Sequence, residues 1–263
     1  MIRITTCIKQ VPGTTKVEVD EETGVLKRDG IESKMNPYDL YALETALKIK
    51  EDKGAVLSVV SMGPPQASDV IKEAYMMGAD DGLLLSDRKF AGADVLSTAY
   101  TISQGVAANG MPDLIICGKQ TTDGDTAQVG PEMAEFLDIP HVANVVCIRE
   151  VKKDAIVVDM DMPNSVETVE VAFPCLITVE KGIHQPRLPS FKLKMETKDR
   201  PVPILSLKDF TDQDTSRYGL KGSPTQVVRI FPPETDREKE AWQGTGSELA
   251  GRIHDKLIQE KFI

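Results

Sequence analysis

The sequence has few cysteines, and they are far apart. None of the four has the C-x-x-C spacing of zinc or iron–sulfur sites. Each lies in or beside an apolar run, so we interpret Cys7, Cys117, Cys147 and Cys175 as reduced core cysteines. The three histidines are equally scattered, and we expect no metal site.

Long hydrophobic runs and an excess of basic residues are also missing. No apolar run approaches the ~20 residues that a membrane-spanning helix needs. The first residues, Met1 to Thr5, are typical of a strand and not of a signal peptide. With 31 Lys and Arg against 41 Asp and Glu, the formal net charge is −10, which argues against a broad surface for nucleic acid. We therefore expect a cytoplasmic protein with no membrane span and no nucleic-acid partner.

Three familiar chemical motifs are absent as well. No G-x-G-x-x-G follows a predicted strand, and no G-x-x-x-x-G-K-[ST] occurs anywhere in the chain. No Ser, His and Asp arrangement of the nucleophilic type is recognisable. The usual dinucleotide motif, an ATP-hydrolysing P-loop and a self-sufficient hydrolase are therefore not supported, and we expect no catalytic residue in this chain alone.

What the first 140 residues do contain is an alternation of short apolar runs with helical patterns. We predict strands over 2–8, 56–62, 82–85 and 114–117, and helices over 37–53, 68–77 and 93–108 with a fourth from about 126. A hairpin over 16–20 and 25–28 interrupts the first crossover. The alternation predicts an α/β fold: a Rossmann-like, mostly parallel sheet with helices on both faces.

After Pro140 the pattern changes to strands without helices between them, over 141–149, 155–159, 166–171 and 176–179. We expect these strands to extend the sheet in antiparallel fashion. Residues 181–203 form a basic, proline-marked loop, and 204–263 a C-terminal arm that ends in an amphipathic helix. The helix is typical of a docking arm, and packing into the core is the alternative. The predicted division is therefore 1–180, 181–203 and 204–263.

The loop over 118–131 is the strongest ligand candidate, because ligands of open parallel sheets sit at the carboxyl ends of strands. Gly124 and Gly130 allow close approach of the backbone to a ligand. Asp125 or Thr126 can cap the fourth helix, and N–H groups of 126–128 can donate to phosphate. An ordinary capped loop explains the local features equally well.

Two charged residues near this loop have simpler interpretations. Lys9 is either a phosphate partner or a solvated lysine at a strand end, and the sequence alone favours the second. Asp39 follows Asn36 and Pro37, so it is better explained as a helix-start residue than as a general base.

Taken together, five segments resemble the β subunit of electron transfer flavoprotein over essentially the whole chain. They are Lys9-Gln10-Val11-Pro12, Met35-Asn36-Pro37-Tyr38-Asp39 with Ala42 and Glu44, Met62-Gly63-Pro64, Met77-Gly78-Ala79-Asp80 and the 118–131 loop. The resemblance implies an adenine-nucleotide site. Its residues would be Cys7, Lys9, Asn36, Asp39, Met62, Gly118, Asp123, Gly124, Asp125, Thr126, Ala127, Gln128 and Val129.

The resemblance also implies protein partners. The arm would dock on the α subunit of the flavoprotein, and the loop over 187–195 would recognise a flavin-dependent dehydrogenase. In that loop we expect Arg187, Leu188, Phe191 and Met195 to meet the partner, with Phe191 as the apolar anchor.

The family has two branches, which differ in the ligand of the β subunit. One branch holds structural AMP, and the bifurcating branch holds FAD that exchanges hydride with NADH. The small residues between Asp123 and Pro131 resemble the bifurcating branch. That likeness implies FAD as cofactor, NAD as transient substrate, and ferredoxin or flavodoxin as low-potential acceptor. An AMP-holding subunit and a stand-alone adenine-nucleotide-binding protein are the alternatives.

Overall fold

The structure is a computed structural model that describes residues 1–13, 33–228 and 240–263. It divides into two compact units, Met1–Val228 and Arg229–Ile263. The hairpin predicted over 16–20 and 25–28 lies outside the described residues. Within those residues, no helix is both long and apolar enough to cross a membrane.

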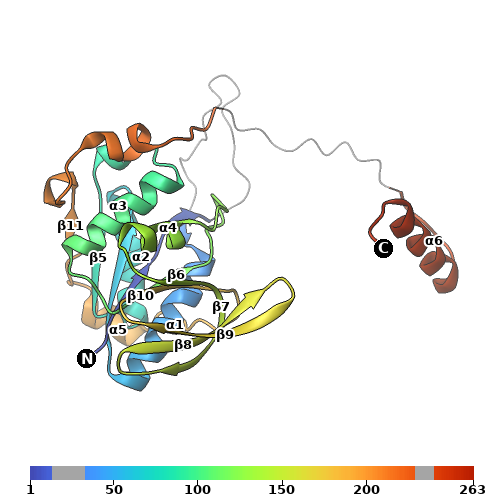
Figure 1. The fold of residues 1–263 in the computed structure, drawn as a ribbon, viewed down its shortest axis with the longest axis horizontal. Coiled ribbons are helices and arrows are strands. Elements are labelled where there is room, and N and C mark those ends of the chain that lie inside the picture. Colours follow the sequence, from blue (N-terminus) through green and yellow to red (C-terminus); the bar gives the residue numbers. More distant parts are fainter. Residues whose placement is uncertain (14–32, 229–239) are drawn as a thin grey trace. The chain divides into compact units, whose positions relative to one another are not determined.

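The first unit is built on a nine-stranded sheet in the order β11-β5-β4-β1-β6-β10-β7-β8-β9 (Figure 1). Neighbours from β11 through β7 pair in parallel, and β7, β8 and β9 pair antiparallel. The predicted mostly parallel sheet with an antiparallel extension is confirmed. The strands are β1 Arg3–Cys7, β4 Val56–Met62, β5 Asp81–Leu85, β6 Leu114–Gly118, β7 His141–Val151, β8 Ala155–Met162, β9 Ser165–Ala172, β10 Cys175–Val179 and β11 Ile204–Leu205; β2 Gln10–Pro12 and β3 Ser33–Met35 form a separate small sheet.

Helices cover both faces of this sheet, as the alternating pattern predicts. Apolar side chains of α1 and α2 pack in the core on one face, and those of α3 and α4 pack in the core on the other. Fully burying one such aliphatic side chain contributes roughly 1.5–3 kcal/mol, so the two cores provide the main stabilisation. The helices of the first unit are α1 Pro37–Lys53, α2 Ser68–Met77, α3 Val95–Ala108, α4 Val129–Phe136 and α5 Phe191–Thr197.

Strand β10 does not belong to the antiparallel extension in which the sequence pattern placed it. It lies between β6 and β7 and pairs in parallel with both. The reason is burial on both faces: every residue of β10 is buried, whereas β9 at the sheet edge is mostly exposed. A short strand that is buried on both faces suits the centre of a parallel sheet better than its edge.

Residues 204–228 belong to the first unit and not to a separate arm. Strand β11 pairs with β5, and Phe210 stacks on Phe90 with ring centroids 5.5 Å apart. Tyr218 is buried beside the same ring at 5.7 Å. These contacts join segments that are far apart in the sequence, so no local pattern predicts them. The first unit therefore ends at Val228 and not at the predicted boundary of residue 203.

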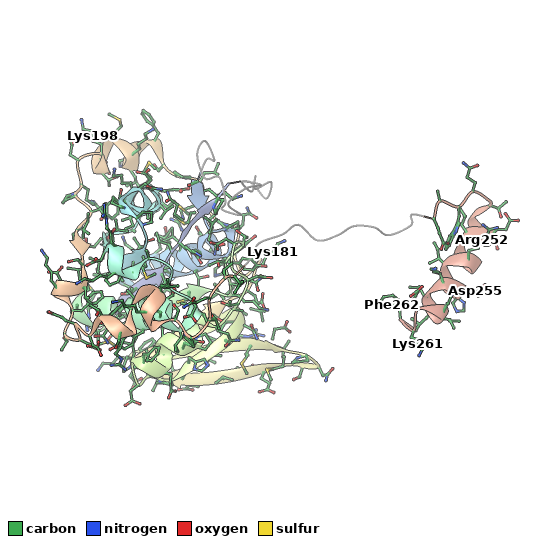
Figure 2. All side chains as sticks on the ribbon, turned by 90° about the horizontal axis from the view of Figure 1, so that it is seen from above. Lys181, Lys198, Arg252, Asp255, Lys261 and Phe262 are labelled. Carbon is green, nitrogen blue, oxygen red and sulfur yellow. The ribbon has the colours of Figure 1, made fainter. Side chains whose placement is uncertain are left out.

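The second unit contains α6, Gly246–Gln259. Thr245 and Glu248 form a capping box at its start, which satisfies two N–H groups that a helix otherwise leaves unpaired. The side chains of Arg252 and Asp255 project from the helix (Figure 2). Within this unit, apolar side chains of the helix are exposed, namely Ile253, Leu257 and Ile258.

Candidate functional site

The candidate site lies where the chain reverses direction across the sheet. From β1 the chain runs outward through β4 and β5, then returns to form β6 on the other side of β1. In open α/β sheets, ligands bind at this switch point, beyond the carboxyl ends of the strands. The last residue of β1, Cys7, and the penultimate residue of β6, Cys117, are register partners there.

The two thiols are part of the core. Both side chains are buried, and the neighbouring Cys7 thiol together with burial raises the pKa of the Cys117 thiol well above its usual value. A neutral, buried thiol is a poor nucleophile and a poor ligand for a cation. At the candidate site, Cys7 thus contributes its backbone, which leads from the end of β1 to Lys9, and not its thiol.

Asn36 ties the start of α1 to the loop that follows β6. Its side-chain amide donates to the Gln120 carbonyl at 2.9 Å and accepts from the Thr122 N–H at 3.2 Å. The residue occupies the N-cap position that the sequence predicts, yet its side chain makes no capping hydrogen bond. The amide therefore fixes the loop and does not satisfy the helix end.

Asp39 lies under the same loop, in the first turn of α1. One carboxylate oxygen accepts the Lys9 backbone N–H at 2.8 Å. Burial raises the pKa of Asp39 to about 7, although hydrogen bonds from Asn36 and Lys9 oppose that rise. A buried carboxyl group whose pKa is raised toward neutrality is a frequent property of functional sites.

The Lys9 side chain is partly exposed, but it is ion-paired and not free in solvent as the sequence favours. Its ammonium group binds both carboxylate oxygens of Asp123, at 2.9 and 2.7 Å. This ion pair joins the end of β1 to the middle of the loop, 114 residues away. Sequence spacing gives no signal for such a contact.

Gly118 is required by close packing at the site. A Cβ atom added there would lie 2.6 Å from the Asp39 side chain and 2.7 Å from the Tyr38 backbone. Gly130 is similarly constrained, because an added Cβ would lie 2.6 Å from Thr178. Gly124 is different, since its nearest atom would be the Thr121 hydroxyl at 3.4 Å, an ordinary contact. A Cβ atom at Gly124 would thus meet no atom within 4 Å other than this hydroxyl.

The loop ends later than the sequence predicts, because α4 begins at Val129 and not near residue 126. Asp125 and Ala127 take left-handed backbone angles, with φ of 54° and 55°, and such residues cannot continue a right-handed helix. Gln128 stands at the N-cap, so neither Asp125 nor Thr126 caps the helix.

Three backbone N–H groups immediately before α4 are available to a ligand. No described residue accepts a hydrogen bond from the N–H groups of Thr126, Ala127 or Gln128. Thr126 and Gln128 are exposed, and Ala127 is half-buried. Together with the positive end of the helix dipole, such N–H groups form an anion site. Met62 lies half-buried at the end of β4, beside β1.

Of the predicted partner residues, Arg187 is bound to the chain itself, and the other three are exposed. Arg187 binds the buried Glu44 of α1 through its N–H, Nε and Nη2 groups at 2.9–3.0 Å, so it holds the segment onto the first unit. Leu188, Phe191 and Met195 are 87%, 76% and 53% exposed. The prediction of a loop over 181–203 is wrong in part, because α5 forms within it. Phe191 and Met195 are one helical turn apart on this helix, and Lys198 follows it (Figure 2).

Glu44 belongs to one of the segments on which the family resemblance rests, but the sequence does not predict its pairing with Arg187. It stands between Ala42, Leu43 and Ala46 on the buried side of α1. A carboxylate in that position needs a cationic partner, because an unpaired buried charge is very costly. The sequence therefore predicts that some Arg or Lys must reach it, but not which one.

Comparison with known proteins assigns the chain to a family. The profile described as "Electron transfer flavoprotein domain" matches residues 23–210. Electron transfer flavoprotein subunit beta of Thermoanaerobacterium thermosaccharolyticum is 41% identical over 263 residues, with all of both chains covered. Subunit CarD of the caffeyl-CoA reductase-Etf complex of Acetobacterium woodii is also 41% identical, and the acryloyl-CoA reductase electron transfer subunit gamma of Anaerotignum propionicum is 38% identical, each with full coverage of both chains. The chain belongs to the electron transfer flavoprotein family and is similar over its whole length to the β subunits of that family.

Proposed function

We propose that this chain is the β subunit of a heterodimeric, electron-bifurcating flavoprotein, and that it binds FAD at the 118–129 loop. The observation that carries the proposal is the group of N–H donors at Thr126, Ala127 and Gln128, which immediately precede α4 and lie beside the switch point. Membership of the flavoprotein family supports a flavin or AMP as the ligand class.

The residues present fit a nucleotide with phosphate groups. The N–H donors would hold the diphosphate, and Gly118 lets the loop lie directly on Asp39 and Tyr38. Asn36 would keep Gln120 and Thr122 in place beneath the ligand. Asp123, Gly124 and Asp125 would flank the diphosphate, with Val129 at the helix start and Met62 at the neighbouring strand end.

Bound FAD would supply the redox chemistry, by accepting hydride from NADH and passing electrons singly to two acceptors. The chain itself would bind and orient the flavin. We propose the α-subunit flavin and then a dehydrogenase as one route, and ferredoxin or flavodoxin as the other. The small residues of the loop between Asp123 and Pro131 favour FAD over the smaller AMP.

Two surfaces would contact partners. We propose that Leu188, Phe191 and Met195 bind the dehydrogenase, because three exposed apolar side chains near one short helix make a suitable anchor. The relatives' names fit this role, since two of them belong to caffeyl-CoA and acryloyl-CoA reductase systems. The exposed apolar side of α6 would dock on the α subunit.

Ligand stoichiometry tests the proposal. The chain is copurified with its partner subunit, the ligands are released with acid, and they are quantified by chromatography. Two FAD per heterodimer are expected. One FAD with one AMP would contradict the bifurcating assignment, and a chain with neither partner nor flavin would contradict the whole proposal.

A pair of variants locates the ligand. Gly124→Trp places a large side chain where the phosphate would approach the loop, so it is expected to abolish retention of the β-bound flavin while the fold is kept. Ala108→Trp is the control, because Ala108 is exposed at the end of α3, away from the carboxyl ends of the strands. Normal flavin content in Gly124→Trp would count against the loop.

A further inference from the structure

Asp123 flanks the diphosphate in the function proposed above, but its ion pair with Lys9 has no role there. Lys9 is held by its main chain on both sides: its N–H donates to Asp39 at 2.8 Å, and its carbonyl accepts the Asn36 N–H at 2.9 Å. Only the side chain is left to respond to a ligand. Its direction is set by Asp123.

The carboxylate of Asp123 presents two oxygen atoms to the Lys9 ammonium group, as a phosphate of a ligand would. Both carboxylate oxygens contact the ammonium group, at 2.9 and 2.7 Å. Partial burial raises the pKa of Asp123, but hydrogen bonding and attraction from Lys9 outweigh it and leave that pKa below its usual value. The side chains of Lys9 and Asp123 are 43% and 34% exposed, so the pair can be opened from solvent.

Carboxylates near the loop leave few positive charges for an anionic ligand, so the pairing of Lys9 matters for binding. In the described chain, the loop and the start of α1 carry Asp39, Asp123 and Asp125, and the cations beside them are Lys9 and Lys119. Lys119 is already paired with Glu180. A phosphate at the N–H groups of 126–128 would therefore meet a nearby carboxylate and a lysine whose charge that carboxylate neutralises.

We propose that Asp123 is an internal substitute for the ligand's phosphate: it occupies Lys9 until the nucleotide displaces it. This inference rests on the proposed function, since it requires a phosphate-bearing ligand at the loop. Asp123 then sets selectivity, because only an anionic ligand offers Lys9 a replacement partner. The opposite arrangement, in which the Lys9–Asp123 pair closes over the bound ligand, makes contrary predictions.

The test is calorimetric titration of the full chain, freed of copurified nucleotide, with AMP, FAD and adenosine. Asp123→Asn is expected to bind AMP and FAD roughly fivefold more tightly, the scale of one partly exposed ion pair. Its affinity for uncharged adenosine should not change. Lys9→Gln should weaken AMP binding, and the double variant should lose the gain.

Two controls keep the result interpretable. Asp125→Asn removes a carboxylate from the same loop that pairs with Gln120 and not with Lys9, so it should give a smaller gain. Asp123→Ser provides a second way to free Lys9, and circular dichroism checks that each variant is folded. Weaker AMP binding by folded Asp123→Asn and Asp123→Ser would overturn the inference in favour of a closing pair. Absence of AMP and FAD binding by the wild type and every variant would instead refute the proposed function, and the inference with it.

Discussion

The carboxylate of Asp39 accepts the backbone N–H of Lys9 at 2.8 Å, which joins the first turn of α1 to the chain that leaves β1. Only 5% of Asp39 is exposed, and Gly118 must be glycine for the loop to lie against it. The buried carboxyl is thus covered by the loop that we propose for the nucleotide. Its protonation is coupled to the packing of the site.

Asp39 makes stability depend on pH near neutrality. Burial raises its pKa from 3.8 to about 7, so between these values the folded chain holds a proton that the unfolded chain has released. The stabilisation is complete below about pH 4 and is lost progressively up to about pH 7, by about 4 kcal/mol in all at 1.36 kcal/mol per pKa unit, of which about 3 kcal/mol is lost above pH 5. Asp39→Asn should remove this loss, as urea unfolding at pH 5 and pH 8.5 can measure. Asp69→Asn, at an exposed position, is the control, and an unchanged pH dependence in Asp39→Asn would refute the assignment.

Asn36 is expected to hold the loop in place. Asn36→Ala removes two hydrogen bonds and leaves the Gln120 carbonyl without this donor, which should cost about 2 kcal/mol of unfolding free energy. Hydrogen exchange at the Thr122 amide should accelerate. Asn109→Ala, at the exposed end of α3, is the matched control. Equal exchange at Thr122 in both variants would show that the amide is not a support for the loop.

Two glycines of one loop should respond differently to the same methyl group. Gly118→Ala places a Cβ atom 2.6 Å from Asp39, so overpacking should destabilise the fold by about 1–3 kcal/mol. Gly124→Ala meets only an ordinary 3.4 Å contact and should stay within about 0.5 kcal/mol of the wild type. Denaturant unfolding compares the two. Similar losses would mean that the close approach at Gly118 is relaxed in solution.

The exposed apolar side chains on α5 should matter for the partner and not for the fold. Phe191→Ala with Met195→Ala is expected to weaken dehydrogenase binding by about tenfold or more, the effect of removing an interface anchor. Flavin content and association with the α subunit should be unchanged. Leu220→Ala is the control, because Leu220 is also exposed, on another segment of the chain. Undiminished electron transfer to the dehydrogenase in the double variant would reject this surface.

Local patterns predict the elements of the fold closely. Strand β4 and helix α2 have the predicted bounds, because an apolar run ended by glycine or a clear helical period is complete within a few residues. The order of the strands in the sheet and the packing of distant segments are not predicted by local patterns. The parallel placement of β10 and the packing of Phe210 on Phe90 depend on segments more than 50 residues apart, which no local period encodes.

In the candidate site too, the sequence predicts what depends on local order and misses what depends on long-range contacts. Gly118 and the loop before α4 follow from a strand, a glycine and polar residues in order, so the sequence locates them. The roles of Asn36 and Lys9 do not follow, because Asn36 has the features of a helix cap and Lys9 those of a solvated lysine. Each side chain is instead directed to the loop, more than 80 residues away.

The most direct measurement is an experimental structure of the heterodimer with its copurified nucleotides. Our account predicts the diphosphate of FAD on the N–H groups of Thr126, Ala127 and Gln128, with Lys9 turned from Asp123 to a phosphate oxygen. A nucleotide bound elsewhere in this subunit, with those N–H groups facing only water, would contradict it.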